Sequence, residues 1–328
     1  MTTHKELPFA VVLTSLFTSE DMPIHLIYRL SDLSEADYRT FKKEWPEVAE
    51  ERRLALARHM ADIAEDNYIV DFTPLFAHLF TDKAAVVRVA ALDGVWDAES
   101  PDIVAPILTM LKSDPDVSVR ASAARALAHY ILLAEWGQID TELETSIIEA
   151  LLAEYDKPLV AQEVKRAALE AVSASGHPRV AELIDDAYEE GNDDMQLSAI
   201  FAMGNSADDR WLPILEAELG SLSPDFRAEA ARACGMIGSQ SAIDALEELL
   251  TDKELEVGLA AVYALGQIGG ERVTALLSRL AEDPDFEEFY DAIDEALEEM
   301  DMMGSEFDLL AFDDDEDDDA FPDDLRLN

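Results

Sequence analysis

Histidines, cysteine and paired carboxylates are the residues of this sequence that could do chemistry, as metal ligands, nucleophiles or general bases. The six histidines lie at positions 4, 25, 59, 78, 129 and 177 and are followed by Lys, Leu, Met, Leu, Tyr and Pro. They are too scattered to predict a metal-ligand set, whose donors recur at short spacings. The phosphate-binding, nucleophile-elbow and zinc-protease motifs GxxxxGKS/T, GxSxG and HExxH are absent from the sequence. Carboxylate pairs carry no information among 72 Asp and Glu residues, so the sequence predicts no catalytic, metal-binding or cofactor-binding residue.

A nine-residue pattern recurs along the chain at an almost fixed interval. Its clearest copies read VRASAARAL, FRAEAARAC and VGLAAVYAL. Successive copies begin at Val87, Val119, Val164, Met195, Phe226 and Val257. Most steps between copies are 31 or 32 residues, a period that is typical of a stacked-helix solenoid.

Each repeat contains two stretches whose apolar residues fall at helical spacing. Val180, Leu183 and Ile184 mark one first helix, and the alanine-rich pattern marks the second helix that follows a turn. Small side chains let neighbouring helices pack near the short end of the ~8–10 Å range of interaxial distances. Glycines at 31-residue spacings are expected to close the helices in a left-handed conformation, namely Gly204, Gly235, Gly266, Gly238 and Gly269.

The only cysteine, Cys234, occupies the position of the pattern that holds Leu127, Met203 and Leu265 in other copies. We therefore expect a small buried apolar residue rather than a reactive thiol. A single cysteine forms no intrachain disulfide, which fits a reducing compartment such as the cytoplasm.

Between the two helices of a repeat lies an acidic turn followed by an apolar residue and an arginine. Examples are Asp114 to Arg120 and Asp225 to Arg227, and an Asp–Arg pair of this kind could lock the turns of neighbouring repeats together. With its paired alanines and closing Leu-Gly, the pattern resembles the HEAT-repeat family, specifically the short phycobilisome-lyase-like kind, over roughly residues 71–300. The resemblance implies an all-α, right-handed α-solenoid of about seven or eight HEAT-like helical pairs. Gln196 and Gly258 replace the arginine in later copies, so we expect the Asp–Arg ladder to be interrupted.

Two relatives within this fold are enzymes, and the sequence departs from both. The metal-dependent hydroxylase that acts on a lysine-derived residue carries His-Glu pairs as iron ligands, whereas none of the histidines here precedes a glutamate. The HEAT-like DNA glycosylase depends on a basic concave face, which the acidic composition argues against. The resemblance therefore favours a non-catalytic protein.

We expect three regions along the chain. Residues 1–70 form an N-terminal helical cap with a degenerate first repeat around Arg53, and the stretch from Pro8 to Phe17 is expected to be a helix of that cap. Residues 71–303 form the solenoid, and residues 304–328 are expected to be a disordered acidic tail.

A candidate binding surface follows from one position of the second helices, five residues after the ladder arginine. Down the stack this outward position holds Arg58, Asp93, Arg125, Glu170, Phe201, Arg232 and Tyr263. Aromatic and arginine residues are enriched where proteins bind one another, so Arg125, Phe201, Arg232 and Tyr263 are predicted to contact a partner in the concave face. The alternative is that the rings of Phe201 and Tyr263 pack against the adjacent helix instead of contacting a partner.

A second candidate lies where the step between Val119 and Val164 inserts about fourteen residues, from about Tyr130 to Glu142. Insertions in repeat proteins map to one face, often the binding face, so Trp136 is also predicted to contact a partner.

The net charge of −48, from 24 Lys and Arg against 72 Asp and Glu, argues against nucleic acid and anionic membranes as partners. A basic protein partner is compatible with that charge, and so is an acidic surface that serves only solubility. We therefore expect a cytoplasmic protein-binding scaffold or adaptor without a cofactor, while the oligomeric state stays open. The alternative function is a lyase-like or assembly factor acting on a chromophore-bearing or modified protein.

Overall fold

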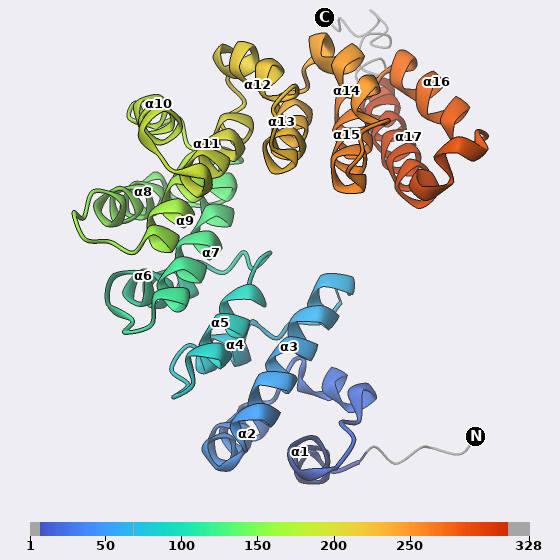
Figure 1. Ribbon diagram of the computed structural model, residues 1–328. Coiled ribbons are helices and arrows are strands. Elements are labelled where there is room, and N and C mark those ends of the chain that lie inside the picture. The colour runs from blue at the N-terminus through green and yellow to red at the C-terminus, as the bar shows by residue number, and fades with distance from the viewer. Residues whose placement is uncertain (1–6, 68, 314–328) are drawn as a thin grey trace, which may run out of the picture. The chain divides into compact units, whose positions relative to one another are not determined.

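Every regular element is a helix in the part of the chain that the computed structural model describes, residues 7–67 and 69–313. The helices follow one another in antiparallel pairs, which confirms the predicted α-solenoid (Figure 1). The chain forms two compact units, Met1–Ala199 and Ile200–Asn328. No helix among the described residues is long and apolar enough to cross a membrane.

Unit 1 begins with α1, α2 and α3 and continues with helical pairs. Its helices are α1 (Phe9–Thr18), α2 (Glu35–Glu44), α3 (Glu50–Asp66), α4 (Thr73–Leu79), α5 (Ala85–Asp93), α6 (Val104–Ser113), α7 (Val117–Glu135), α8 (Thr141–Tyr155), α9 (Gln162–Val172) and α10 (Val180–Glu190). The next helix, α11 (Asp193–Asn205), spans the boundary between the units.

Unit 2 continues the same alternation of a first and a second helix. Its helices are α12 (Leu212–Glu218), α13 (Pro224–Ile237), α14 (Ile243–Leu249), α15 (Leu255–Ile268), α16 (Glu271–Leu280) and α17 (Tyr290–Asp313). The last helix therefore continues beyond residue 303, and the rest of the predicted acidic tail, 314–328, lies outside the described residues.

The N-terminal segment is built around aromatic side chains. Phe41 and Trp45 stack with their ring centroids 5.0 Å apart, and Phe17 contacts both rings edge-on. The indole N–H of Trp45 donates a hydrogen bond of 2.7 Å to Asp82 Oδ2, in the turn between α4 and α5. This contact ties the segment to the first regular repeat.

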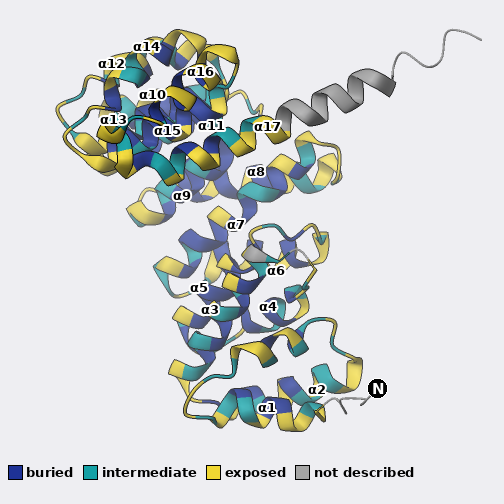
Figure 2. Ribbon diagram, turned by 90° about the vertical axis from the view of Figure 1, so that its right-hand side faces the viewer, coloured by how far each residue is buried: buried dark blue, intermediate teal, exposed yellow. Residues whose placement is uncertain are grey.

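The second helices pack on one another through small residues, and they are largely buried inside their units (Figure 2). In unit 1, α3 contacts α5, α5 contacts α7 and α7 contacts α9; in unit 2, α13 contacts α15 and α15 contacts α17. Ala123, Ala230 and Ala261, which share one position of the repeat, are all fully buried.

The glycines of the repeat have two different structural roles, which corrects the expectation that all of them close helices in a left-handed conformation. Only Gly238 and Gly269 have left-handed backbones, with φ of 75° and 63°. Gly204 and Gly235 lie inside helices, where an added Cβ would come within 2.6 Å of Ala233 Cα and 2.7 Å of Ala264 Cα, respectively. These positions need glycine because the next helix passes too close for a side chain.

The Asp–Arg pairs predicted from the turns are present and link neighbouring repeats. Arg88 donates two hydrogen bonds to Asp114, at 2.8 and 2.7 Å, and a third of 2.8 Å to the carbonyl of Asp82 in its own turn. Arg227 binds Asp252 and the carbonyl of Ser221 in the same way. A third pair joins Arg53 to Asp82.

Candidate functional site

The outward position of the second helices lies on the solvent-facing side of unit 1. Arg58 on α3, Asp93 on α5 and Arg125 on α7 are all exposed. Although Asp93 is exposed overall, desolvation by neighbouring atoms raises the pKa of its carboxyl, while the charges of Arg125 and Arg58 act in the opposite direction. The three side chains share one surface, because α3 and α7 both contact α5 and the charges of both arginines act on Asp93.

In unit 2 the same position brings Phe201, Arg232 and Tyr263 onto α11, α13 and α15. The structure leaves Phe201 half-buried, whereas the Tyr263 side chain is 51% exposed. The Tyr263 hydroxyl accepts a hydrogen bond of 3.0 Å from the side-chain amide of Gln267, one helical turn further on. Tyr263 is therefore held in position with its ring open to solvent.

Arg232 is not a free cation on this surface. Its guanidinium forms ion pairs with Glu229 on α13, at 3.3 Å, and with Glu256 on α15. The pattern contained Glu229, three residues before Arg232, but could not show Glu256, which belongs to the next repeat. The two carboxylates outnumber the cation, so the charge around Arg232 is net negative.

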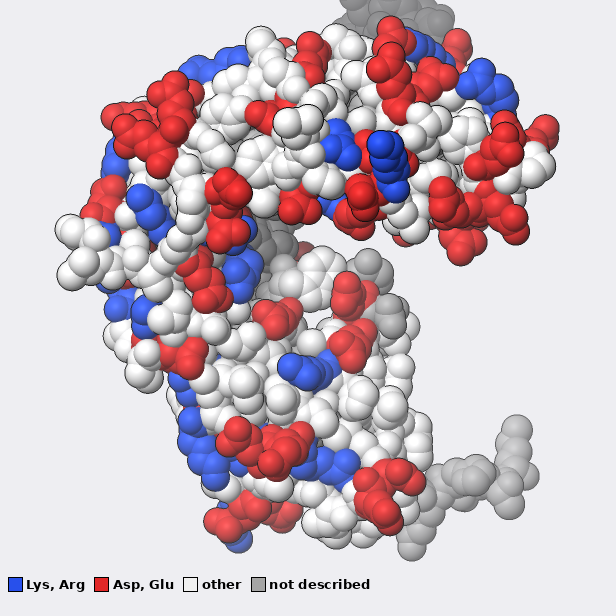
Figure 3. Space-filling model, viewed as in Figure 1, with Lys and Arg blue, Asp and Glu red and all other residues white. Residues whose placement is uncertain are grey.

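The row has a fourth residue in unit 2, Glu295 on α17, which the sequence analysis did not include. An added Cβ at Gly266 would meet Ala296, just as an added Cβ at Gly235 would meet Ala264. Glu295 precedes Ala296 as Tyr263 precedes Ala264, and it is exposed. Asp and Glu side chains gather over the beginning of α17 (Figure 3), so the row ends in an acidic surface.

Arg125 and Trp136, predicted on separate grounds, lie on the same face of α7 because eleven residues make about three helical turns. Leu132 lies between them and is 39% exposed, although the sequence analysis did not select it. Trp136, which caps the helix, is 66% exposed. The insertion in this repeat therefore lengthens α7 and exposes the apolar side chains of Leu132 and Trp136 to solvent.

A family model described as HEAT repeats matches residues 72–163 and 209–298, more than half of the chain. The chain belongs to the HEAT-repeat family. The matched stretches contain α4 to α8 in unit 1 and α12 to α16 in unit 2. The match is to HEAT repeats in general and does not single out the phycobilisome-lyase-like kind. No curated protein matches the chain in sequence.

Several solved structures resemble this HEAT-repeat protein. Human deoxyhypusine hydroxylase in complex with glycerol is 17% identical with a TM-score of 0.35, over 90% of this chain and 96% of the other. YibA of Escherichia coli is 17% identical with a TM-score of 0.44, over 87% and 98%. Kap121p bound to Nup53p is 12% identical with a TM-score of 0.45, over 94% of this chain and 40% of Kap121p. None of these similarities assigns a site or a function to this chain.

Cys234, His78 and His129 of this HEAT-repeat protein are fully or partly enclosed. Cys234 is fully buried, as predicted, and burial raises the pKa of its thiol to about 12. Burial also lowers the pKa of His78 and of His129. Within the described residues, the Nε2 atoms of His78 and His129 are buried without a hydrogen-bond partner, which is the environment of a neutral packed ring.

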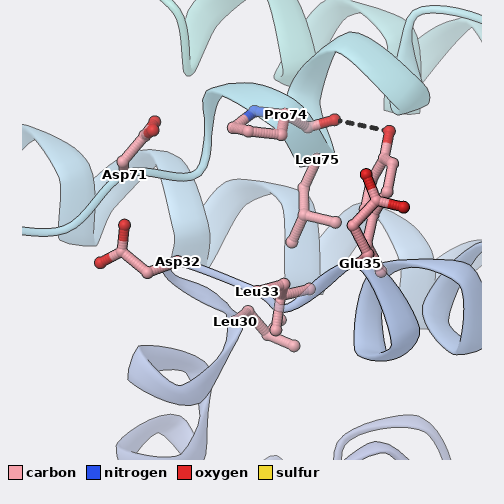
Figure 4. Close-up of a pocket in the computed structure, with 8 residues that line it drawn as sticks. Leu30, Asp32, Leu33, Glu35, Asp71, Pro74 and Leu75 are labelled. Atoms are coloured by element: carbon pink, nitrogen blue, oxygen red, sulfur yellow. Dashed lines mark hydrogen bonds between the residues drawn. The ribbon is translucent and has the colours of Figure 1, made fainter.

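A pocket of about 280 Å³ lies in unit 1 between the end of the 3₁₀ helix Ile24–Leu30, α2 and the start of α4 (Figure 4). Asp32, Glu35 and Asp71 line it, and the Tyr38 hydroxyl donates a hydrogen bond of 3.1 Å to the carbonyl of Pro74 at its edge. No group of three or more His, Cys, Asp and Glu side chains in the described ranges is placed to hold a metal ion. The lining offers acceptors but neither histidine, cysteine nor lysine.

Proposed function

We propose that this HEAT-repeat protein is a non-catalytic scaffold or adaptor that binds a protein partner through the exposed face of its second helices. The observation that carries the proposal is the row of Phe201, Arg232 and Tyr263 on three consecutive second helices. An aromatic ring that is half exposed beside an arginine is the composition found at the energetic centres of protein interfaces. Arg125 and Trp136 give unit 1 a surface of similar composition.

The charges of unit 2 favour a partner that supplies cations. Each arginine between residues 200 and 313 already has an acidic partner. These pairs are Arg210–Asp208, Arg227–Asp252, Arg232–Glu229, Arg272–Asp244 and Arg279–Glu247. The remaining carboxylates would repel nucleic acid and attract a basic protein surface. The lone cysteine agrees with a role in the cytoplasm, where we expect the protein to act.

The test is affinity capture from native lysate with the full-length chain and with the double variant Phe201→Ala, Tyr263→Ala. Each aromatic anchor can contribute about 2 kcal/mol or more at an interface centre, so the double variant should bind several hundred-fold more weakly. Leu222→Ala is the matched control, because Leu222 is 99% exposed in unit 2 but lies outside the second helices. If the double variant with unchanged helicity captures the same partner as the control, the proposed surface is wrong.

A further inference from the structure

The last turn of α7 and its C-cap present two large apolar side chains that are partly exposed in the described structure. Leu132 and Trp136 are one helical turn apart and are 39% and 66% exposed, respectively. Exposed large apolar side chains grouped on one helix face mark interaction surfaces more often than isolated ones do. The stripe that they form on α7 begins at Arg125, three turns before Trp136.

The backbone of Trp136 is held at the end of the helix by hydrogen bonds. The N–H of Trp136 donates to the carbonyl of Leu132 at 3.1 Å, and the N–H of Gln138 donates to that of Leu133 at 2.8 Å. Gly137 makes this closure possible with a left-handed φ of 71°. A residue whose backbone is already ordered loses less conformational freedom when a partner covers it than one in a mobile loop, which favours binding.

The loop after α5 contacts α7 and carries a second indole and two carboxylates. Tyr130 of α7 donates a hydrogen bond of 2.9 Å to the carbonyl of Ser100, which fixes the loop against the helix. Asp97 and Glu99 of the loop are close enough to His129 to oppose the lowering of its pKa by burial. Trp96, the residue before them, is exposed.

Beyond Arg125, the charge around the stripe is of one sign. Neither residues 89–111 nor residues 126–156 contain a lysine or an arginine, while both stretches contain several Asp and Glu. A second copy of this chain, a nucleic acid or an anionic membrane would therefore set negative charge against negative charge. A cationic partner would gain from the same field.

We infer that the end of α7, with Leu132 and Trp136 at its centre, is a docking site for an amphipathic helix flanked by lysine or arginine. Apolar side chains at i, i+3, i+4 and i+7 of such a helix would pack on the two apolar side chains of α7. Its cations would face Asp97, Glu99 and Glu135. The inference rests on the proposed function, because it names the kind of partner that the unit 1 surface takes.

The experiment is a selection from a displayed library of random sixteen-residue peptides against the full-length chain, with counter-selection against the Trp136→Ala chain. Enriched peptides should carry apolar residues at helical spacing and a net positive charge. A synthetic copy of an enriched peptide should bind the unmodified chain at least about 30-fold more tightly than Trp136→Ala, because a central tryptophan contributes about 2 kcal/mol or more. Binding should also shift the tryptophan fluorescence to the blue, since Trp45 and Trp211 are already buried.

Two controls separate this site from the rest of the proposed function. Asp97→Asn with Glu99→Gln should weaken peptide binding several-fold and reduce its salt dependence, as expected for a charged rim. Phe201→Ala with Tyr263→Ala should leave peptide binding unchanged, because both residues lie in unit 2.

Equal affinity of the enriched peptides for the unmodified chain and Trp136→Ala, with unchanged circular dichroism, would overturn the inference. So would a selection that enriches no peptide over the counter-selection, or only acidic or neutral ones. Peptides that lose binding only to the Phe201, Tyr263 double variant would also refute docking at α7, while supporting the proposed surface of unit 2.

Discussion

The ladder pair Arg227–Asp252 should be among the contacts on which unit 2 depends most, and replacing Asp252 with asparagine tests this. The two carboxylate oxygens accept hydrogen bonds of 2.8 Å each from Arg227, and Oδ1 also accepts one of 3.0 Å from the N–H of Glu254. Asparagine keeps the shape and one acceptor oxygen. It removes the negative charge and turns the second oxygen into a donor that faces the guanidinium.

The exposure of the pair decides the size of the effect. The side chains of Arg227 and Asp252 are only 15% and 12% exposed. Breaking a buried pair costs about 3–5 kcal/mol, whereas exposed pairs are worth about 0–1 kcal/mol. We therefore expect Asp252→Asn to lower the free energy of unfolding by about 2–3 kcal/mol. This corresponds to a urea midpoint lower by about 1 M or more.

The chain offers a control in a second Arg–Asp pair that has the same hydrogen-bond geometry but is more exposed to solvent. Arg179 binds Asp156 in unit 1 through two hydrogen bonds of 2.9 Å, but the two side chains are 40% and 51% exposed. Asp156→Asn should therefore cost less than about 1 kcal/mol. Equal costs for the two variants would show that burial does not set the strength of the ladder.

Urea unfolding followed by tryptophan fluorescence reports each unit separately. Trp211 is the tryptophan of unit 2, whereas Trp45, Trp96 and Trp136 lie in unit 1. Replacing Trp211 with phenylalanine therefore leaves the signal of unit 1, and replacing the other three leaves that of unit 2. The hydrogen bonds from Arg227 lower the pKa of Asp252, and the N–H of Glu254 adds to this, while burial opposes it. Because the folded pKa lies below the unfolded value of about 4, the stabilisation is complete above that pH. It should be lost as the pH falls further, so the difference between the unmodified chain and Asp252→Asn should shrink in acid.

Other predictions test the packing of unit 2. Gly235→Ala should destabilise it by about 1–2 kcal/mol, because overpacking against Ala264 Cα at 2.7 Å outweighs the higher helix propensity of alanine; a more stable variant would contradict the close approach. Ala230→Leu should cost about 1–3 kcal/mol or more and exposed Glu248→Ala at most about 0.5 kcal/mol, so equal urea midpoints would refute the assignment of the buried position. Cys234 should react with a thiol reagent only as fast as unit 2 unfolds, given its full burial and raised pKa; rapid labelling of the native chain would contradict this.

The repeat period, the paired helices and the Asp–Arg pairs could be predicted because each repeat places the same residue types in the same environment. Cys234 was predicted correctly for this reason, since the other copies put Leu or Met at its position. Gly204 and Gly235 were misassigned because a glycine near the end of a helix gives the same sequence pattern in two cases. It either closes that helix or leaves room for the close approach of the next helix. Only the distance to the next helix separates the two roles.

The candidate surface was harder to predict because it depends on contacts between repeats. The sequence placed Tyr263 on the outward side but could not show that Glu256 neutralises Arg232. Leu132 was missed because it lies in the insertion, where the repeat pattern no longer says which way a side chain faces. Its exposure follows from the continuation of α7 to Glu135.

The geometry of one helix turn explains why the outward position can serve recognition while the ladder serves stability. Five residues of an α-helix rotate by about 140° beyond one full turn, so the outward side chain faces nearly away from the ladder arginine of the same helix. Arg227 is tied to the turn of the next repeat, whereas Arg232 reaches acidic side chains on the exposed surface. Replacements at the outward position therefore leave the stacking contacts in place. The position accordingly accepts Asp93, Phe201 and Tyr263 as readily as arginine, and this freedom is what a binding surface built on a repeated scaffold requires.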